Sequence, residues 1–525
     1  MAVTKTALPF LYTQLNPTNT NAGGGPEVVD LVNSGLTVLS SRGQRLAQLA
    51  EAAPTVENGL WKLEADGTME LTWHIRPGAQ WHDGAPLTSG DIAFTLRVNQ
   101  DPGLPVLRNQ AYQLVERLDT PDDGTVIVRW KNPYIKADEL FSATLGSLLP
   151  RHLLEHAYAK DSSALFDEAY FNREFVGTGP FKLRSWDAGS GLVLDVVPDY
   201  VLGRPGIEVV EVRYVTEDNA LIAGVLSGSI DLMLGTQVST DQALSIREQW
   251  QGGHVEFADF GTWVQLYPQF VDPTEPLILN LQFRRALMYA IDREVMAASI
   301  QSGLVPVADT FISPRSPYYS TIEASIVRYP YDPGRAARMM GELGYRPGSD
   351  GLLANASGHK ITVGIQATTA QAIHLKAALP IETYWQQIGI ATDIDTVPVQ
   401  LAQDVAYRAN FPGFSIQKQP TDVDAIAKLH SSEARLASRG YRGVNNARYM
   451  DPAMDVLVQR YQTTIPIPQR IQAISQIVHE VSDQLVWMGI FFDTGPALIS
   501  NRLVNVGAGE NGAKATWNAS QWAIR

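Results

Sequence analysis

The pattern of apolar and polar positions predicts strands through the first half of the chain. Leu71, Trp73 and Ile75 alternate with polar residues, which is typical of a half-buried strand. Runs rich in valine and isoleucine and bounded by turn residues predict further strands over 125–130, 192–197 and 209–215. Later segments show helical spacing instead, over 282–300, 333–343, 371–388 and 468–484. The chain is therefore predicted to be a mixed α/β protein.

Two turns and a capped helix are predicted directly after the strand that contains Ile75. Pro77-Gly78 stops the strand, and Asp83-Gly84 forms a second turn. Thr88 lies three residues before Asp91 and precedes an apolar run, which predicts a capping box. In such a box the hydroxyl and the carboxylate satisfy free N–H groups of the first helical turn. The segment therefore indicates a structural unit without catalytic chemistry.

Composition narrows the classes of function. A chain of 525 residues is too long for one hydrophobic core, so two or three lobes are expected. With 45% hydrophobic and 18% charged residues, the protein is an ordinary globular one. The net charge of −14 argues against nucleic acid and anionic lipid as main partners. The lack of cysteine excludes disulfides, thiolate metal sites and cysteine nucleophiles.

The sequence suits an exported protein. No run of about 18 apolar residues occurs, so no segment is predicted to span a membrane. No basic-then-apolar leader precedes Ala7, and Met1-Ala2 has the form of a start codon placed on a mature fragment. We therefore expect that the natural precursor carried a signal peptide.

No catalytic residue, metal ligand set or cofactor motif is predicted. His152 and His156 share one face of a predicted helix, but no acidic partner pattern surrounds them. Residues 507–512 fit G-x-G-x-x-G, yet too few residues follow to build a dinucleotide fold. Neither a G-x-S-x-G elbow nor a P-loop is present. Enzymes that need a nucleophile paired with a base are therefore disfavoured.

Residues 73–92 resemble the signature of the family 5 extracellular solute-binding proteins, the peptide- and nickel-binding receptors of ABC importers. The matching positions are Trp73, Ile75, Arg76, Gly78, Trp81, Asp83, Gly84, Pro86, Leu87, Thr88, Asp91 and Ile92. Further segments resemble the family in order: 15–17, 177–181, 198–200, 226–231, 283–293 and 331–345. The resemblance covers nearly the whole chain and is weakest after Gln400.

This resemblance implies a bilobal α/β periplasmic-binding-protein fold of the large, cluster C type, with an extra inserted lobe and a hinge between lobes. By that implication, lobe I comprises residues 1–41, 177–260 and 492–525. The inserted small lobe comprises residues 42–176, and a ligand-closing lobe comprises residues 261–491. Two lobes are expected to close on the ligand and bury it.

The segment 408–424 resembles the family stretch that lines the ligand cleft. Phe414 replaces the family tryptophan, and Gln417 replaces an aspartate that pairs with the ligand ammonium in peptide-binding relatives. Glutamine is neutral and cannot compensate a buried ammonium, and Lys418 would oppose one. Arg408 is expected to meet a ligand carboxylate or phosphate. If the loop is shifted, Asp422 or Asp424 supplies the negative charge instead.

Six other residues are expected to bind the ligand by resemblance: Asn21, Gly23, Gly24, Tyr112, Phe491 and Phe492. Glycine-rich loops let backbone N–H groups approach a ligand, although a plain surface loop is the alternative for 21–26. Side chains alternate along a strand, so one of the two adjacent phenylalanines should face the ligand and the other the core.

The function predicted from the resemblance is that of an extracytoplasmic receptor, active as a monomer, that delivers a small organic solute to an ABC permease. The resemblance also implies that the protein is periplasmic or lipid-anchored on the outer face of the cell membrane. A peptide-like ligand is the default. A non-peptide ligand on the same scaffold, such as a glycoside, an opine or another polar organic molecule, is the alternative. A surface adhesin or signalling receptor and a hydrolase-like enzyme are rival classes.

Overall fold

A computed structural model describes most of the chain. The described residues are 2–3, 25–104, 110–143, 147–171, 174–187, 189–215, 217–234, 238–258, 260–369, 371–401, 404–509 and 513–525. Three predicted ligand residues, Asn21, Gly23 and Gly24, lie outside these ranges. No helix in the described ranges is both long enough and apolar enough to cross a bilayer.

The chain divides into two compact units. Unit 1 comprises Met1–Asp259 with Gly495–Arg525, and unit 2 comprises Phe260–Thr494. The chain therefore passes between the units twice, after Asp259 and after Thr494. The predicted lobe boundaries remain predictions. The segment 42–176 falls within unit 1. That this segment forms a separate lobe remains a prediction.

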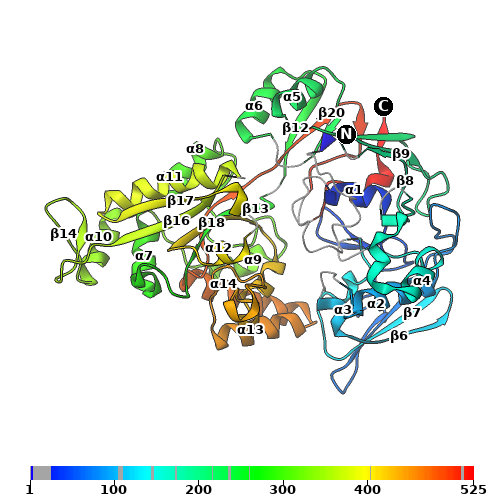
Figure 1. The fold of residues 1–525 in the computed structure, drawn as a ribbon, viewed down its shortest axis with the longest axis horizontal. Helices are drawn as coiled ribbons and strands as arrows, with labels where there is room; N and C mark the ends of the chain where they lie inside the picture. The colour runs from blue at the N-terminus through cyan, green and yellow to red at the C-terminus, as the bar shows by residue number, and fades with distance from the viewer. Residues whose placement is uncertain are drawn as a thin grey trace. The chain divides into compact units, whose positions relative to one another are not determined.

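Unit 1 is built on a seven-stranded mixed sheet in the order β12-β20-β11-β1-β10-β9-β8 (Figure 1). Its strands are β1 (Ala2–Val3), β8 (Phe181–Asp187), β9 (Gly191–Val196), β10 (Val209–Tyr214), β11 (Leu232–Met233), β12 (Gly253–Phe257) and β20 (Pro496–Ser500). The helices of unit 1 are α1 (Gly25–Val32), α2 (Ser89–Gln100), α3 (Gln110–Leu114), α4 (Arg151–Lys160), α5 (Asp218–Leu226) and α6 (Thr240–Gln249). The strands predicted over 192–197 and 209–215 are confirmed as β9 and β10.

A second sheet of unit 1 has the order β4-β5-β7-β6. Its strands are β4 (Trp61–Leu63), β5 (Met69–His74), β6 (Val115–Asp122) and β7 (Thr125–Trp130). The exposure of β5 alternates residue by residue, as its sequence predicts. Small two-stranded sheets pair β2 (Thr37–Leu39) with β3 (Arg45–Ala47), and β21 (Leu503–Val504) with β22 (Ala523–Ile524).

Asp91 joins the starts of two helices. Its Oδ2 accepts the backbone N–H of Thr88 at 2.9 Å, which closes the predicted capping box of α2. Its Oδ1 accepts the backbone N–H of Arg151, the first residue of α4, at 2.9 Å. Asp91 is 4% exposed, so both hydrogen bonds are shielded from water. The signature aspartate is therefore a structural residue of unit 1.

His82 ties the signature segment to the glycine-rich segment 177–179. Its Nδ1 accepts the N–H of Gly177 at 3.1 Å, so its Nε2 donates to the carbonyl of Gly179, also at 3.1 Å. Burial lowers the pKa of His82 to about 4, which keeps the ring neutral. A Cβ on Gly177 would lie 2.0 Å from the carbonyl oxygen of Val32. Only glycine fits this approach of the chain to the end of α1.

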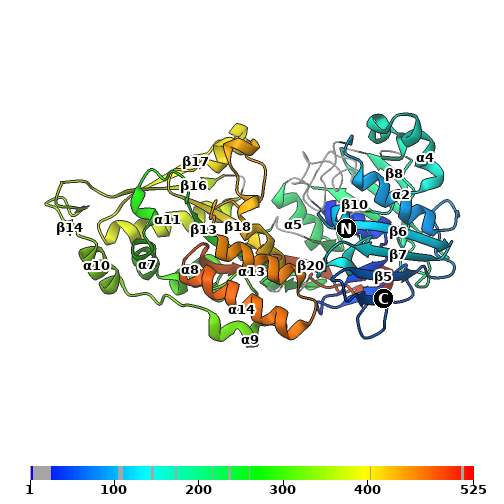
Figure 2. The same ribbon diagram turned by 90° about the horizontal axis from the view of Figure 1, so that it is seen from below.

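Unit 2 is built on a five-stranded sheet in the order β17-β16-β18-β13-β19. Its strands are β13 (Thr262–Pro268), β16 (Thr362–Thr368), β17 (Ala391–Val397), β18 (Phe414–Pro420) and β19 (Met488–Asp493). The first helices of unit 2 are α7 (Leu281–Tyr289), α8 (Arg293–Ile300), α9 (Tyr319–Ile322) and α10 (Pro333–Glu342). They are followed by α11 (Ala372–Gln387), α12 (Val405–Ala409), α13 (Pro452–Thr463) and α14 (Ile467–Asp483). A hairpin of β14 (Arg346–Pro347) and β15 (Leu353–Ala354) follows α10. Helices α13 and α14 lie side by side (Figures 1 and 2).

The helix predicted over 282–300 is in fact two helices, so this prediction was wrong. Asp292 interrupts the helical spacing because its carboxylate accepts the N–H of Val295 at 3.0 Å and caps α8. Asn280 caps α7 in the same way, through the N–H of Gln282 at 2.8 Å. The other predicted helices are confirmed as α10, α11 and α14, within a residue or two at each end.

Candidate functional site

One face of the five-stranded sheet of unit 2 is lined by polar side chains. In the pairing of β13 with β18, Gln265 lies opposite Gln417, and Tyr267 lies opposite Ser415. In the pairing of β16 with β18, Gln366 lies opposite Ser415. Directly opposed residues point to the same side of a sheet. These five residues therefore share one surface, named the polar face below.

The polar face is partly linked by its own hydrogen bonds. Gln417 Nε2 donates to Ser415 Oγ at 2.9 Å, and Gln265 Nε2 donates to Tyr267 Oη at 2.9 Å. Gln265 is 1% exposed, and its Oε1 has no hydrogen-bond partner among the described residues. Buried polar atoms are normally all paired in protein cores. This face is therefore polar beyond what packing of the sheet requires.

Phe414 and Gln417 lie on opposite faces of β18, because side chains alternate along a strand. The Phe414 ring is fully buried, and its centroid lies 5.0 Å from that of Trp385 in α11. The other face of the sheet is thus the packing face for α11. Of the two residues, the structure places only Gln417 on the polar face.

Lys418 also points away from the polar face and is neutralised. Its Nζ lies 2.9 Å from Asp493 Oδ2, and both side chains are largely buried. Gln301 Nε2 donates to the other carboxylate oxygen of Asp493 at 2.6 Å. The positive charge that the sequence predicts beside Gln417 is therefore paired with a buried carboxylate, and its effect on a ligand ammonium remains a prediction.

Two half-buried arginines, Arg408 and Arg435, have no carboxylate partner among the described residues. Arg408 lies in α12, next to Tyr407, whose hydroxyl donates to Asp395 at 3.3 Å. Arg435 Nε donates to the carbonyl of Gly443 at 2.9 Å. Burial lowers the pKa of both guanidiniums, and the positive charge of Arg408 lowers the pKa of Arg435 further.

Other buried arginines of unit 2 are held by protein oxygens. Arg284 donates to the carbonyls of Ile278 and Gln484. Arg293 pairs with Asp309 at 2.9 Å, and Arg448 donates to the side chains of Gln269 and Asn410. These residues complete the packing of unit 2. Among the described residues, Arg408 and Arg435 donate hydrogen bonds to fewer protein acceptors than Arg284, Arg293 and Arg448 do.

Arg435 acts electrostatically on the polar face. Burial raises the pKa of Tyr267, whereas a hydrogen bond with Asn446 and then the positive charge of Arg435 lower it. Arg408 acts on His374 of α11, whose pKa is lowered to about 4 by burial and then by the charges of Lys418 and Arg408. His374 Nε2 accepts the N–H of Lys418 at 3.0 Å, so this neutral ring braces β18. The charge of Arg435 thus acts on Tyr267, and the charge of Arg408 acts on His374.

The two predicted phenylalanines of β19 point to opposite faces. Phe492 lies opposite Trp263, on the face that also carries Gln265, whereas Phe491 lies opposite Val264. Both rings are buried, and the Phe492 ring lies 5.7 Å from that of Phe260. Whether Phe492 touches a ligand remains a prediction.

Tyr112 lies in unit 1 and is fully buried in α3. Its ring packs edge-on against Phe141, with centroids 5.9 Å apart. Arg408 and Gln417 thus both belong to unit 2, whereas Tyr112 lies in the packing of unit 1. A ligand contact by Tyr112 remains a prediction.

Sequence reasoning did not identify Gln265, Tyr267, Gln366 and Arg435. A signal for the first two existed, because Gln265 and Tyr267 alternate with the apolar Val264 and Leu266 along β13. A strand whose two faces are both buried rarely carries glutamine on one of them. Arg435 lies in an irregular segment, where no periodic signal marks it.

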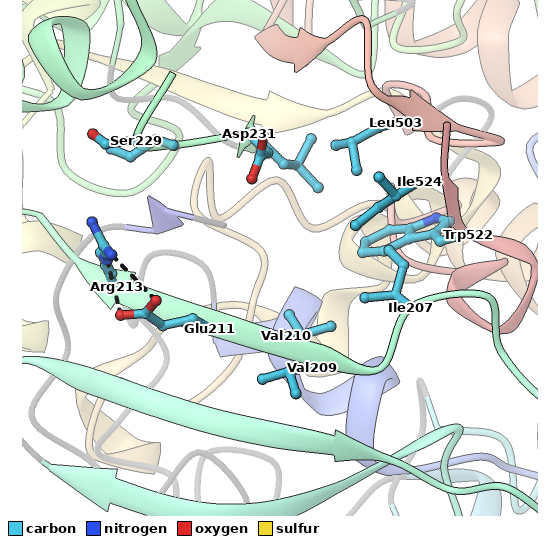
Figure 3. Close-up of a pocket in the computed structure, with 12 residues that line it drawn as sticks. Ile207, Val209, Val210, Glu211, Arg213, Ser229, Asp231, Leu503, Trp522 and Ile524 are labelled. Carbon is cyan, nitrogen blue, oxygen red and sulfur yellow. Dashed lines mark hydrogen bonds and ion pairs between the residues drawn. The ribbon is translucent and has the colours of Figure 1, made fainter. Parts of the chain in front are cut away.

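Unit 1 contains a separate pocket of about 260 Å³ (Figure 3). Apolar side chains line much of it, among them Ile207, Val210 and Trp522. Its charged residues are paired: Arg213 with Glu211 at 3.0 Å, and Asp231 with Arg502. The described residues also hold no cluster of three or more His, Cys, Asp or Glu suited to a metal ion. The polar face is therefore the stronger candidate site.

Comparison with known proteins decides the family. A model described as bacterial extracellular solute-binding proteins, family 5 Middle, matches residues 49–432. The chain belongs to this family. Among curated relatives, it is 23% identical to the oligopeptide-binding protein AppA of Bacillus subtilis over 441 residues, which cover 82% of this chain and 76% of AppA.

Solved structures of this family share the fold. The oligopeptide-binding protein of Thermus thermophilus, complexed with a pentapeptide, matches with a TM-score of 0.78 at 19% identity, covering 100% of this chain and 96% of its own. The periplasmic EDTA-binding protein EppA matches with a TM-score of 0.82 at 17% identity, covering 100% and 95%. These structural similarities confirm the predicted fold class, and the family model confirms the predicted family.

Proposed function

We propose that this family 5 protein is the substrate-binding receptor of an ABC importer, which captures a small organic solute outside the cytoplasm and delivers it to the permease. The observation that carries the proposal is the polar face of unit 2, with two half-buried arginines that lack carboxylate partners among the described residues. A buried polar surface of this kind in a family of solute-binding proteins is suited to holding a polar ligand.

A peptide-like solute is the default ligand, since AppA and the Thermus protein are named for oligopeptides. One observation favours the alternative of a non-peptide solute. Gln417 lies on the polar face, where the family resemblance places an ammonium-binding aspartate, and its neutral side chain bonds to Ser415. The name of EppA indicates that this fold also accommodates a polycarboxylate without a peptide backbone.

The proposed receptor acts as a monomer and catalyses no reaction. Capture and release require only binding, and the relatives compared above are named as binding proteins. Export with or without a lipid anchor is part of the proposal, because the family is extracellular by description. A surface adhesin or signalling receptor is distinguished by the absence of permease and ATPase genes beside its own.

Native mass spectrometry of freshly purified protein tests the proposal. We expect one small organic solute per chain, which denaturation and refolding remove. Adding the recovered solute back at a hundredfold excess over Kd should stabilise the stripped protein by about 2.7 kcal/mol. Small-angle scattering should then show a smaller radius of gyration, as ligand-induced closure of a hinged receptor requires. A protein that carries no solute and is stabilised by none in a peptide and polar-organic panel contradicts the proposal.

A further inference from the structure

We propose that the pocket of unit 1 is an open strand position in the seven-stranded sheet, between β10 and β11, which takes an extended segment joined to the chain ahead of Met1 (Figure 3). Such a segment would lengthen β1 in the N-terminal direction. In any longer form of the chain, it would anchor the N-terminal tether to unit 1. The open strand position belongs to unit 1 alone and does not depend on a solute at the polar face.

The first observation is the register of β1. This strand of two residues lies between two parallel neighbours, with Ala2 opposite Arg213 of β10 and Met233 of β11. As described, β1 pairs with β10 only at Arg213 and Tyr214, although β10 begins at Val209. Neighbouring strands lie about 4.8 Å apart, so β10 and β11 are roughly 9.6 Å apart, which leaves the width of one strand between them. The open strand position is therefore in line with β1.

The second observation is the direction of the β10 backbone. Glu208 accepts the N–H of Val196, and Tyr214 donates its N–H to Ser190, each at 2.9 Å. Both residues thus direct their backbone groups toward β9, as every second residue of β10 does. Val209 therefore directs its N–H and C=O toward the open strand position, where they meet no strand among the described residues. A strand that continues β1 backward in the same register reaches Val209 and pairs with it.

The third observation is that side chains of both flanking strands line the pocket. Val210 of β10 and Leu232 of β11 are buried and belong to the hydrophobic core of unit 1. Apolar side chains also form one end of the pocket: Ile207, Leu503, Trp522 and Ile524 (Figure 3). Val209 and Ile524 are 43% and 54% exposed, which is high for side chains of this kind. An inserted strand would cover this apolar surface.

Alternation of side chains fixes the chemistry of the occupant, because opposed residues of neighbouring strands point to the same side. By the register of Ala2, a residue placed directly before Met1 would lie opposite Glu211. Glu211 is paired with Arg213 at 3.0 Å, so an uncharged polar residue suits this position. The residue before it would lie opposite Val210 and should be apolar. A small molecule could fill the apolar end of the pocket but would not continue the register of β1, so a strand is the proposed occupant.

Short N-terminal extensions of the full chain test the proposal. Ser-Thr-Val-Thr directly before Met1, left after removal of a cleavable tag, puts valine opposite Val210 and threonine opposite Glu211. Ser-Thr-Thr-Val has the same composition but exchanges these two positions. The first extension should raise the melting temperature by at least about 2 °C over the unextended chain. The second should leave it unchanged to within about 1 °C.

Hydrogen exchange locates the added strand. In the Ser-Thr-Val-Thr protein, amides in 209–214 and 230–234 should exchange at least about tenfold more slowly than in the unextended chain. Amides of β4 and β5, in the other sheet of unit 1, should be unaffected. Ser-Thr-Pro-Thr should lose this protection, because proline lacks the N–H that would pair with Val209.

The lack of cysteine in the chain allows a positional test. A cysteine in place of the last threonine of the extension, combined with Glu211→Cys, should give an intramolecular crosslink with a short bismaleimide. Ser185→Cys is the control, because β8 lies at the edge of the same sheet, beyond β10 and β9. The same extension should not crosslink to the cysteine at that position.

Equal melting temperatures and exchange rates for the extended and unextended proteins overturn the proposal. Equal effects of Ser-Thr-Val-Thr and Ser-Thr-Thr-Val do so as well, since a strand in register must distinguish them. If a free acetyl-Ser-Thr-Val-Thr-amide peptide slows exchange in β10 while neither extension does, the pocket takes a strand from another chain, and the assignment to the N-terminal side is wrong.

Discussion

Replacing Asp91 with alanine should destabilise unit 1 by about 3 kcal/mol. The substitution removes the acceptor of two buried backbone N–H groups, those of Thr88 and Arg151, each bonded at 2.9 Å. Loss of a helix cap costs about 1 kcal/mol, and a hydrogen bond to a charged group contributes about 1.5–3 kcal/mol. The loss of both hydrogen bonds to this one carboxylate gives the expected decrease of about 3 kcal/mol in the free energy of unfolding, because the two helices relax only partly.

Thr88→Ala separates the two halves of the capping box. The substitution removes the hydroxyl but leaves the Thr88 N–H free to donate to Asp91, so it should cost only about 1 kcal/mol. Asp66→Ala is the matched control, because Asp66 is an exposed turn residue of the same unit that bonds to Thr68. It should change the stability of unit 1 by no more than about 0.5 kcal/mol.

Hydrogen exchange of the stripped protein, followed by mass spectrometry in increasing urea, measures these effects locally. Peptides that cover α2 and α4 should lose protection together in Asp91→Ala, because one carboxylate caps both helices. Affinity for the recovered solute should stay within about twofold of wild type. The structural role of the signature would be refuted by a loss below about 1 kcal/mol, or by a large loss of affinity at unchanged stability.

Three further outcomes are expected. Burial holds the pKa of His82 at about 4 in the folded protein, below the 6.5 of an unperturbed histidine, so folding opposes protonation. The contribution of His82 to the free energy of unfolding should be complete above pH 6.5 and decrease toward pH 4, by about 2 kcal/mol at pH 5. In urea titrations, the free energy of unfolding of His82→Asn should decrease less over this pH range. Lys418→Met should lower the free energy of unfolding by about 3–5 kcal/mol, because it leaves Asp493 buried without a counter-charge. A decrease below about 1 kcal/mol would mean that water can replace Lys418 as the partner of Asp493. Gln417→Asp should raise affinity for peptides with a free N-terminus over their acetylated counterparts in calorimetry, whereas sub-micromolar binding of free-amine peptides by the wild type would show that the glutamine does not exclude an ammonium.

Local patterns predicted the elements well where neighbouring residues decide the structure. The alternation around Leu71 and the spacing of Thr88 from Asp91 are properties of one strand and one helix start, and both are confirmed. The helix over 282–300 was predicted too long, since a capping aspartate inside a helical pattern looks like an ordinary polar position. The second bond of Asp91, to α4, joins residues 60 positions apart and has no local signal.

The candidate site was only partly predictable for the same reason. Gln417 and Arg408 were predicted as candidates because they lie in a segment that resembles the family. The neutralisation of Lys418 by Asp493 joins residues far apart in the sequence and becomes visible only once β18 and β19 share a sheet. The polar face depends on the register of three strands, which no single segment encodes. Phe414 and Gln417 also point to opposite faces of β18, although both lie in the segment that resembles the family's cleft-lining stretch.

The most direct test of the central claim is a calorimetric titration of stripped protein with the solute recovered from the native protein, with the solute weighed by mass spectrometry afterwards. We expect one site per chain, a Kd below about 1 μM and a solute of unchanged mass after hours of incubation, as a receptor that binds without turnover requires. Products of altered mass would indicate an enzyme, and binding too weak to measure would contradict a receptor that captures its solute from dilute surroundings.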